Sequence, residues 1–271
     1  MRKKIILGMS LITLLAGCTQ TTDTNVKLSD ISDNSHEVTV ANTQIIQEKK
    51  TSVPIFMFHY IRNSDKTKDL LGYNLSTDPI KFEKLLKYFH DNGYKTIHVQ
   101  DFLEGKANKK DIILTFDDGY EDFYTTAYPL LKKYGYTASV AVITGKINKD
   151  QFMTLAQIKE MHKDGFEILS HTVNHINLKT ATIAIQQSEL EKSKTDLEKV
   201  IGEPIDGFVY PSGKYNPDTI SILKEDRYKI ALTTHPGIAS LDQDLFTLPR
   251  IRVDNRTNIS FLKNHLSKWI Q

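Results

Sequence analysis

The segment IILTFDDGY at residues 112–120 decides how this sequence is interpreted. Its first five residues are typical of a strand that is buried on both faces. Two adjacent carboxylates, Asp117 and Asp118, follow at the carboxyl end of that strand. Active sites of parallel β/α folds lie at this edge of the sheet, but an ordinary Asp-Gly turn with solvated acids gives the same local pattern. The segment alone therefore leaves a catalytic pair and a surface turn both open.

A second apolar strand ends in two histidines. In FEILSHTVNH, residues 166–175, His171 and His175 stand four positions apart directly after the strand. If the chain turns helically there, both imidazoles face the same side and can reach one cation. With one carboxylate they would form the three-ligand arrangement of a catalytic divalent metal, which keeps a coordination position open. A single histidine would more often be structural, so it is the pair that indicates a metal site.

The rest of the chain after residue 51 alternates short apolar strands with amphipathic helices. This alternation implies parallel pairing, and either a barrel or an open doubly wound sheet would satisfy it. No internal repeat and no second domain boundary is visible. We expect strands at residues 53–58, 111–116, 138–143, 166–170, 207–210, 229–233 and 248–253, and helices at residues 78–92, 121–134, 155–164, 183–201, 217–226 and 259–269.

TFDDGY at residues 115–120 and HTVNH at residues 171–175 resemble the first two motifs of the polysaccharide deacetylases, carbohydrate esterase family 4. The resemblance covers residues 53–253 and implies a distorted (β/α) barrel in one domain. It also implies a divalent metal, usually zinc, as the cofactor. The residues that it assigns to the metal are Asp118, His171 and His175, and Asp117 is assigned the role of general base.

The segment VPIFMFHY at residues 53–60 narrows the resemblance, as does LPRIRV at residues 248–253. Both are similar to the branch that contains the poly-N-acetylglucosamine (intercellular adhesin) deacetylases. In that branch the motif order is circularly shifted, and a histidine in the position of His59 serves as general acid. A buried structural histidine would look the same from its position alone. His235 is the substitute for the role of general acid.

The third family motif, Arg-x-Pro-Tyr-Gly, corresponds to VYPSG at residues 209–213. Val209 replaces the arginine, as in the adhesin-deacetylase branch, and Ser212 replaces the tyrosine. A backbone N–H can serve an oxyanion whatever its side chain is, so Ser212 stays a candidate donor, and Tyr120 is expected to face the substrate or its oxyanion. Arg250 is one candidate for the group that orients Asp117. The remaining histidines are expected to be non-catalytic: His36, His90, His98, His162 and His265.

Composition sets limits on partners. The 271 residues are 39% hydrophobic and 25% charged, with a net charge of +2, which is ordinary for one catalytic domain. The balance of charges gives no long-range field that would favour nucleic acid. We therefore expect no nucleic acid as a partner. The resemblance implies a glycan, and no protein partner is predicted.

The N-terminus predicts export. Residues 2–4 are basic and residues 5–16 form a short apolar run that ends at LAGC, residues 15–18, which resembles the lipobox of bacterial lipoproteins. The prediction is a signal peptide at residues 1–17, lipidation of Cys18, a flexible tether at residues 18–50 and a catalytic domain at residues 51–271. A plain cleaved signal and a short edge strand at residues 37–40 are the alternatives. The protein would then lie on the extracellular face of the cell membrane, with partial release as a second possibility.

Together these features predict a metal-dependent enzyme that removes N-acetyl groups from a cell-surface amino-sugar polymer. The resemblance indicates poly-β-1,6-N-acetylglucosamine of the biofilm matrix. A deacetylase of peptidoglycan or of another glycan such as xylan is the alternative within enzymes. A non-catalytic glycan-binding surface lipoprotein is the alternative of another class. It is disfavoured because the chain has Asp117, Asp118, His171, His175 and His59.

Overall fold

A computed structural model describes residues 52–269 of the chain, and their strands form a closed barrel. Seven strands pair in parallel around a ring, which closes where β2 pairs with β4 along Ile55↔Ile113 to Phe58↔Phe116. The (β/α) barrel expected from the resemblance is thereby confirmed, and the open doubly wound sheet was the wrong alternative. The ring runs β2 (Ile55–Phe58), β10 (Leu248–Arg252), β8 (Ile230–Pro236), β7 (Gly207–Val209), β6 (Glu167–Ser170), β5 (Ser139–Val142) and β4 (Asp111–Phe116).

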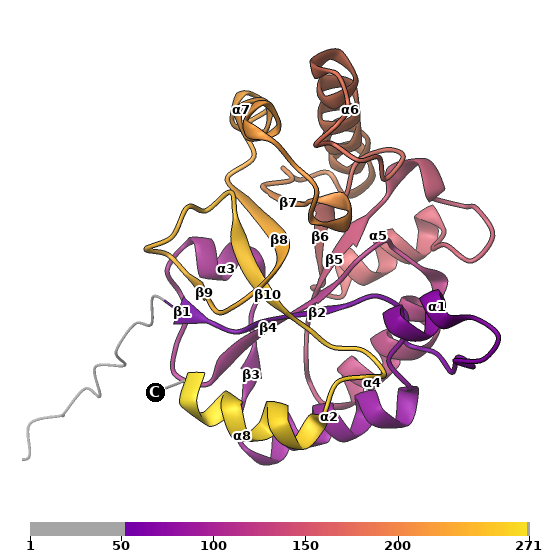
Figure 1. The fold of residues 1–271 in the computed structure, drawn as a ribbon, viewed down its shortest axis with the longest axis vertical. Coiled ribbons are helices and arrows are strands. Elements are labelled where there is room, and N and C mark those ends of the chain that lie inside the picture. The colour runs from indigo at the N-terminus through magenta and orange to yellow at the C-terminus, as the bar shows by residue number, and fades with distance from the viewer. Residues whose placement is uncertain (1–51, 270–271) are drawn as a thin grey trace, which may run out of the picture. The chain divides into compact units, whose positions relative to one another are not determined.

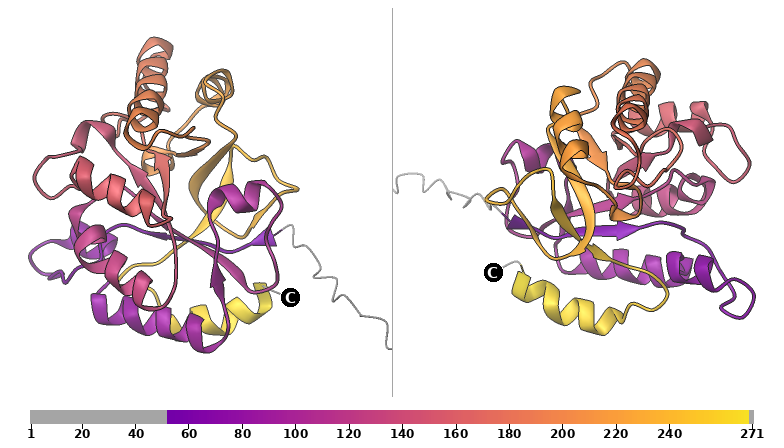
Figure 2. Two further views of the ribbon diagram at one scale, coloured as in Figure 1. Left: turned by 180° about the vertical axis from the view of Figure 1, so that it is seen from behind. Right: turned by 45° about the horizontal axis from the view of Figure 1, so that its top comes forward.

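Helices lie outside the strands, and α2 and α8 lie side by side in all three views (Figures 1 and 2). Their ends follow local chemistry. In α6, the side chain of Thr182 accepts a hydrogen bond from the N–H of Ile185, and Gly202 ends the helix at φ 81°. The helices are α1 (Leu70–Leu75), α2 (Pro79–Asp91), α3 (Val99–Leu103), α4 (Tyr128–Lys133), α5 (Leu155–Lys163), α6 (Ile183–Ile201), α7 (Pro217–Glu225) and α8 (Ile259–Trp269).

Some elements differ from the sequence prediction. The helix expected at residues 121–134 begins instead with a π-helical turn, η1 (Phe123–Ala127), before α4. Several short elements that lack an apolar run of their own were not predicted, because so few residues do not complete a recognisable hydrophobic period. They are α1, α3, β1 (Ser52–Val53), β3 (Lys95–Thr96), β9 (Ala239–Ser240), η2 (Thr144–Lys146) and η3 (Pro211–Gly213).

The predicted signal peptide, Cys18, the tether and the alternative edge strand at residues 37–40 all lie outside the described residues. Among residues 52–269, no helix is both long and apolar enough to cross a bilayer.

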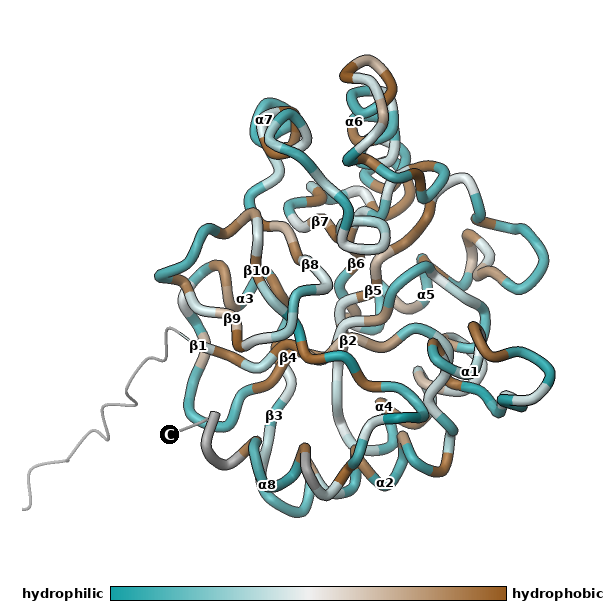
Figure 3. The backbone as a smooth tube through the Cα atoms, viewed as in Figure 1, coloured by the Kyte–Doolittle hydropathy of each residue, from teal (hydrophilic) through white to brown (hydrophobic). Residues whose placement is uncertain are grey.

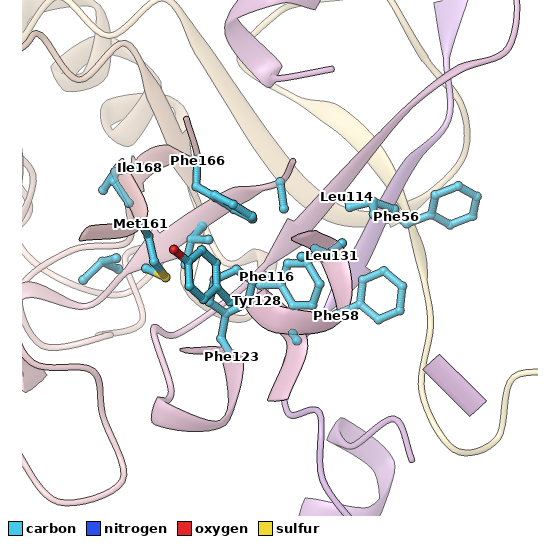
Figure 4. Packing of buried hydrophobic residues seen from close by; sticks show 14 of the residues in the cluster. Phe56, Phe58, Leu114, Phe116, Phe123, Tyr128, Leu131, Met161, Phe166 and Ile168 are labelled. Carbon is cyan, nitrogen blue, oxygen red and sulfur yellow. The ribbon is translucent and has the colours of Figure 1, made fainter. Parts of the chain in front are cut away.

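Apolar layers pack against both faces of the barrel strands. Alternate residues of each strand point to opposite faces, so Ile112 and Leu114 of β4 join the layer beneath the helices while Ile113 joins the layer inside the barrel. The outer layer is rich in aromatic rings, including Phe116, Phe123 and Phe166 (Figure 4). The helices that cover it, such as α2 and α6, alternate hydrophilic and hydrophobic residues along the chain (Figure 3).

We expect Phe166→Ala to lower the free energy of unfolding by about 3–5 kcal/mol, because it leaves a cavity in the outer layer. Phe166 is 3% exposed and its ring centroid lies 5.1 Å from that of Tyr128 and 6.1 Å from that of Phe123. Ile185→Ala on α6 is the control, since that side chain is 50% exposed and should cost less than about 1 kcal/mol. Equal losses in urea unfolding of the two variants would contradict this assignment of the core.

Candidate metal and catalytic site

The predicted site residues meet at one mouth of the barrel, because the inward-facing positions of the strands continue into them. In β4 the inward series runs Ile113, Thr115 and then Asp117, two residues at a time. Leu169 on β6 precedes His171 in the same way, and Leu248 on β10 precedes Arg250. The apolar filling of the barrel therefore gives way to polar residues at the carboxyl ends of the strands.

Asp118, His171 and His175 form a cluster that can hold a metal ion. The Nε2 atoms of His171 and His175 lie 3.3 and 3.4 Å from Oδ1 of Asp118, and all three ligand atoms lie within 4.8 Å of one another. Oδ1 of Asp118 is buried and has no hydrogen-bond partner, which is costly for a carboxylate oxygen unless a cation satisfies it. A carboxylate and two imidazoles fit a catalytic divalent metal with open coordination positions.

The local conformation that joins the two histidines differs from the predicted one. Residues 171–175 do not turn helically. Thr172 and His175 adopt left-handed φ angles of 64° and 56°, and the N–H of His175 donates to Oγ1 of Thr172 at 2.9 Å. A compact loop therefore brings both imidazoles to one point. The predicted helical turn was wrong, although the two histidines do lie close together as expected.

A backbone carbonyl orients the first imidazole. Nδ1 of His171 lies 2.6 Å from the carbonyl oxygen of Val209, so Nδ1 carries the proton and Nε2 is left to face Asp118. Burial alone would lower the pKa of His171, but the adjacent carboxylate of Asp118 outweighs burial and raises it. Val209, the residue that replaces the family arginine, thus contributes through its backbone.

Arg250 holds Asp117. Its Nη1 and Nη2 donate to Oδ1 and Oδ2 of Asp117 at 2.7 Å each, while its Nε donates to the carbonyl oxygen of Thr233 at 2.8 Å. Both side chains are buried. Burial alone would raise the pKa of Asp117, but the charge and hydrogen bonds of Arg250 outweigh it and keep that pKa well below its ordinary value. Asp117 is therefore a carboxylate at neutral pH.

Of the two histidines considered as general acid, only His59 lies at this site. Its Nε2 lies 3.9 Å from Oδ2 of Asp117, and its side chain is 12% exposed. Burial lowers the pKa of His59, and the charges of Asp117 and Asp118 oppose that shift. His235 is exposed and lines a neighbouring pocket, where its ring lies 6.3 Å from that of Tyr215.

One open cavity of about 550 Å³ is lined by His59, Asp117, Asp118, His171 and His175. Ser212 and Tyr120 also line it. Ser212 has a left-handed backbone at φ 52°. The ring of Tyr120 stacks on that of Tyr60 at 3.9 Å, and burial together with the charge of Asp118 raises the pKa of Tyr120. Its phenol therefore keeps its proton and can donate a hydrogen bond.

Glu189 on α6 is a residue that the sequence analysis missed. It is 7% exposed, and its Oε2 accepts from the N–H groups of Val173 and Asn174 at 2.9 and 2.8 Å, while Oε1 accepts from Nδ2 of Asn174 at 2.6 Å. This carboxylate fixes the loop between the two histidines. The available signal was its place on the buried face of α6, where Gln186 and Leu190 are its neighbours.

Comparison with known proteins gives consistent relatives. The family model described as polysaccharide deacetylase matches residues 104–231. A Bacillus subtilis protein named as a polysaccharide deacetylase, YxkH, is 36% identical over 211 residues, which cover 76% of this chain and 73% of that protein. The poly-beta-1,6-N-acetyl-D-glucosamine N-deacetylase of Staphylococcus aureus is 25% identical over 94% of this chain and 93% of its own. Among solved structures, the Streptococcus pyogenes deacetylase PplD in complex with acetate matches with a TM-score of 0.75 and 35% identity over 79% of this chain and 98% of its own.

We expect Glu189→Ala to weaken the binding of Zn²⁺ or Co²⁺ by about tenfold or more, because it releases the loop that carries both histidines. Glu189→Gln should lose less, since its carbonyl oxygen can still accept from the two backbone N–H groups. Glu191→Ala, at an exposed position of the same helix, is the matched control. Metal titration of the purified variants measures this, and an affinity of Glu189→Ala equal to that of the wild type would exclude the role.

Proposed function

The chain belongs to the polysaccharide deacetylase family of hydrolytic enzymes, and we propose that it removes N-acetyl groups from an amino-sugar polymer of the bacterial cell surface. One observation carries this proposal. The cluster of Asp118, His171 and His175 opens into the same cavity as His59 and Asp117, so the groups that could hold a metal and the acid–base groups face one space. Arg250 holds Asp117 from behind this lining.

Zinc is the metal that we propose for the cluster, since its preferred ligands are carboxylate oxygens and imidazole nitrogens in a site with an open position. When bound, a divalent cation supplies a Lewis acid that polarises the acetamide carbonyl and lowers the pKa of water. Asp118 and the Nε2 atoms of His171 and His175 would hold it.

The chain's own groups supply the proton transfers. Asp117, kept ionised by Arg250, would accept a proton from the attacking water as that water bonds to the acetyl carbon. The backbone N–H of Ser212 would donate a hydrogen bond to the developing oxyanion, and the phenol of Tyr120 would lie on the same side. His59 would donate a proton to the departing nitrogen, and the products are acetate and a glucosamine unit whose amine is cationic at neutral pH.

Poly-β-1,6-N-acetylglucosamine is the polymer that we propose first. The similarity to the Staphylococcus aureus enzyme supports it, as do His59 and the segment at residues 248–253. Peptidoglycan and other glycans such as xylan stay alternatives, because the same groups would hydrolyse their acetyl bonds. A glycan-binding lipoprotein without activity is disfavoured by the complete set of site residues.

We further propose that residues 1–17 are a signal peptide, that Cys18 is acylated, and that residues 18–50 tether a domain of residues 51–271 to the outer face of the membrane. The lipobox-like LAGC sequence supports this location. Such a location would give the enzyme access to a biofilm polymer, both when it is anchored and when part of it is released.

The test is acetate release by the purified full-length chain from poly-β-1,6-N-acetylglucosamine oligomers, chitooligomers, peptidoglycan and acetylated xylan. We expect release from the first substrate, loss on chelation and recovery with Zn²⁺. Asp117→Asn should keep its metal and lose about 10²-fold or more in kcat, whereas His171→Ala should lose the metal. His90→Ala, exposed on α2, is the control. Full activity of Asp117→Asn would remove it from the role of base, and chelator-resistant activity would overturn the metal mechanism.

The Asp117–Arg250 pair also predicts a shift with pH. A general base must be ionised, so kcat/KM falls as the pH drops below the pKa of the base. In Arg250→Gln the charge that lowers the pKa of Asp117 is gone while burial still raises it, so the acid limb of kcat/KM should move to higher pH. Arg250→Lys should move it less. The profile is measured with saturating metal after circular dichroism has checked the fold, and an unmoved limb in Arg250→Gln would contradict the assignment.

A further inference from the structure

A second pocket adjoins the catalytic cavity at the contact between η3 and β8. Ser212 and Thr234 line the catalytic cavity, while their chain neighbours Gly213 and His235 line a pocket of about 430 Å³. Gly213 has φ 65°, and a Cβ placed there would lie 2.1 Å from Oγ1 of Thr234. Only glycine lets η3 and β8 approach this closely, so the two spaces are neighbours along one surface.

The second pocket combines an aromatic wall with positively charged side chains. Tyr215, half-buried and stacked on Tyr210 at 4.4 Å between ring centroids, contributes an aromatic wall. Lys179, Lys214 and His235 line it as exposed side chains. Among the described residues no carboxylate lines this pocket, and none forms an ion pair with either lysine.

The carboxylates of the catalytic cavity face groups other than these lysines. Asp117 is paired with Arg250, and Asp118 faces the two histidines. The remaining charged side chains that line this cavity are Lys146 and Arg252. A cationic sugar in the second pocket would therefore meet Lys179 and Lys214 with no carboxylate lining the same pocket.

We propose that the pocket of Lys179, Lys214 and Tyr215 is a subsite for one adjoining sugar of the polymer, and that it accepts an N-acetylated unit and disfavours a deacetylated one. The inference rests on the proposed function, in which each turnover converts a neutral acetamide into an ammonium group. A unit already converted would bring that ammonium against the two lysines. Like charges repel, so consecutive deacetylation is suppressed and the free amines become spaced along the chain.

The test uses the full-length chain on β-1,6-linked N-acetylglucosamine pentamers that are either fully acetylated or carry one glucosamine on a defined side of the target unit. Acetate release gives kcat/KM, and mass spectrometry locates the new amine. The wild type should be about three- to tenfold slower when the glucosamine is on one side and not when it is on the other, since only one neighbour enters the pocket. This penalty should shrink as salt is raised to about 1 M, where the Debye length is about 3 Å.

The variants assign the penalty to the lysines. In Lys179→Gln/Lys214→Gln the ratio of kcat/KM for the acetylated and glucosamine-bearing pentamers should approach one, and Lys214→Glu should lower it further. Lys159→Gln removes the same charge from an exposed position of α5 that lines neither pocket, and it should keep the wild-type ratio. A wild-type ratio near one, or a ratio that the lysine variants do not change, overturns the subsite while acetate release still supports the deacetylase. No acetate from any glycan overturns both.

Discussion

The site depends on the buried ion pair between Arg250 and Asp117. The guanidinium joins three strands of the barrel, because it extends from β10, donates to the carbonyl of Thr233 on β8 and to Oγ1 of Thr115 on β4, and holds both oxygens of Asp117. Neither side chain is appreciably exposed. Removing one partner of such a pair leaves an uncompensated buried charge, which typically costs about 3–5 kcal/mol. The same ion pair therefore links the strands at the mouth of the barrel and keeps Asp117 ionised.

The pair also explains how two adjacent carboxylates serve different purposes. Neighbouring residues of a strand point to opposite faces, but Asp118 leaves β4 with φ 77°, so both side chains reach one cavity. Two carboxylates that share a site without counter-charges could not both stay ionised. Arg250 satisfies Asp117, whereas Oδ1 of Asp118 lacks a hydrogen bond and lies beside two imidazoles. The proposed division between base and ligand would then follow from which carboxylate the arginine reaches.

The sequence predicts the regular parts of this structure and leaves out the contacts between distant parts. The helix at residues 183–201 and the strand at residues 111–116 were predicted with the bounds that the structure has, because caps and apolar periods mark their ends. Arg250 could only be one candidate for Asp117, since periodicity reports that a residue is buried and not what it contacts. Glu189 was missed for the same reason. The left-handed turns at Thr172 and His175 carry no glycine, so nothing in the sequence marked the loop that replaces the expected helical turn.

Average charge and local charge lead to different conclusions about partners. A net charge of +2 over 271 residues gives no reason to expect a field at any place on the surface. At the mouth, however, the carboxylates are committed to Arg250 and to the histidines, while Lys146 and Arg252 line one cavity and Lys179 and Lys214 the next. Basic side chains therefore line the surface where the proposed polymer would lie. An enzyme that generates ammonium groups, as we propose, would then be opposed by its own product at this surface. This opposition would need no residue beyond those proposed to bind the substrate.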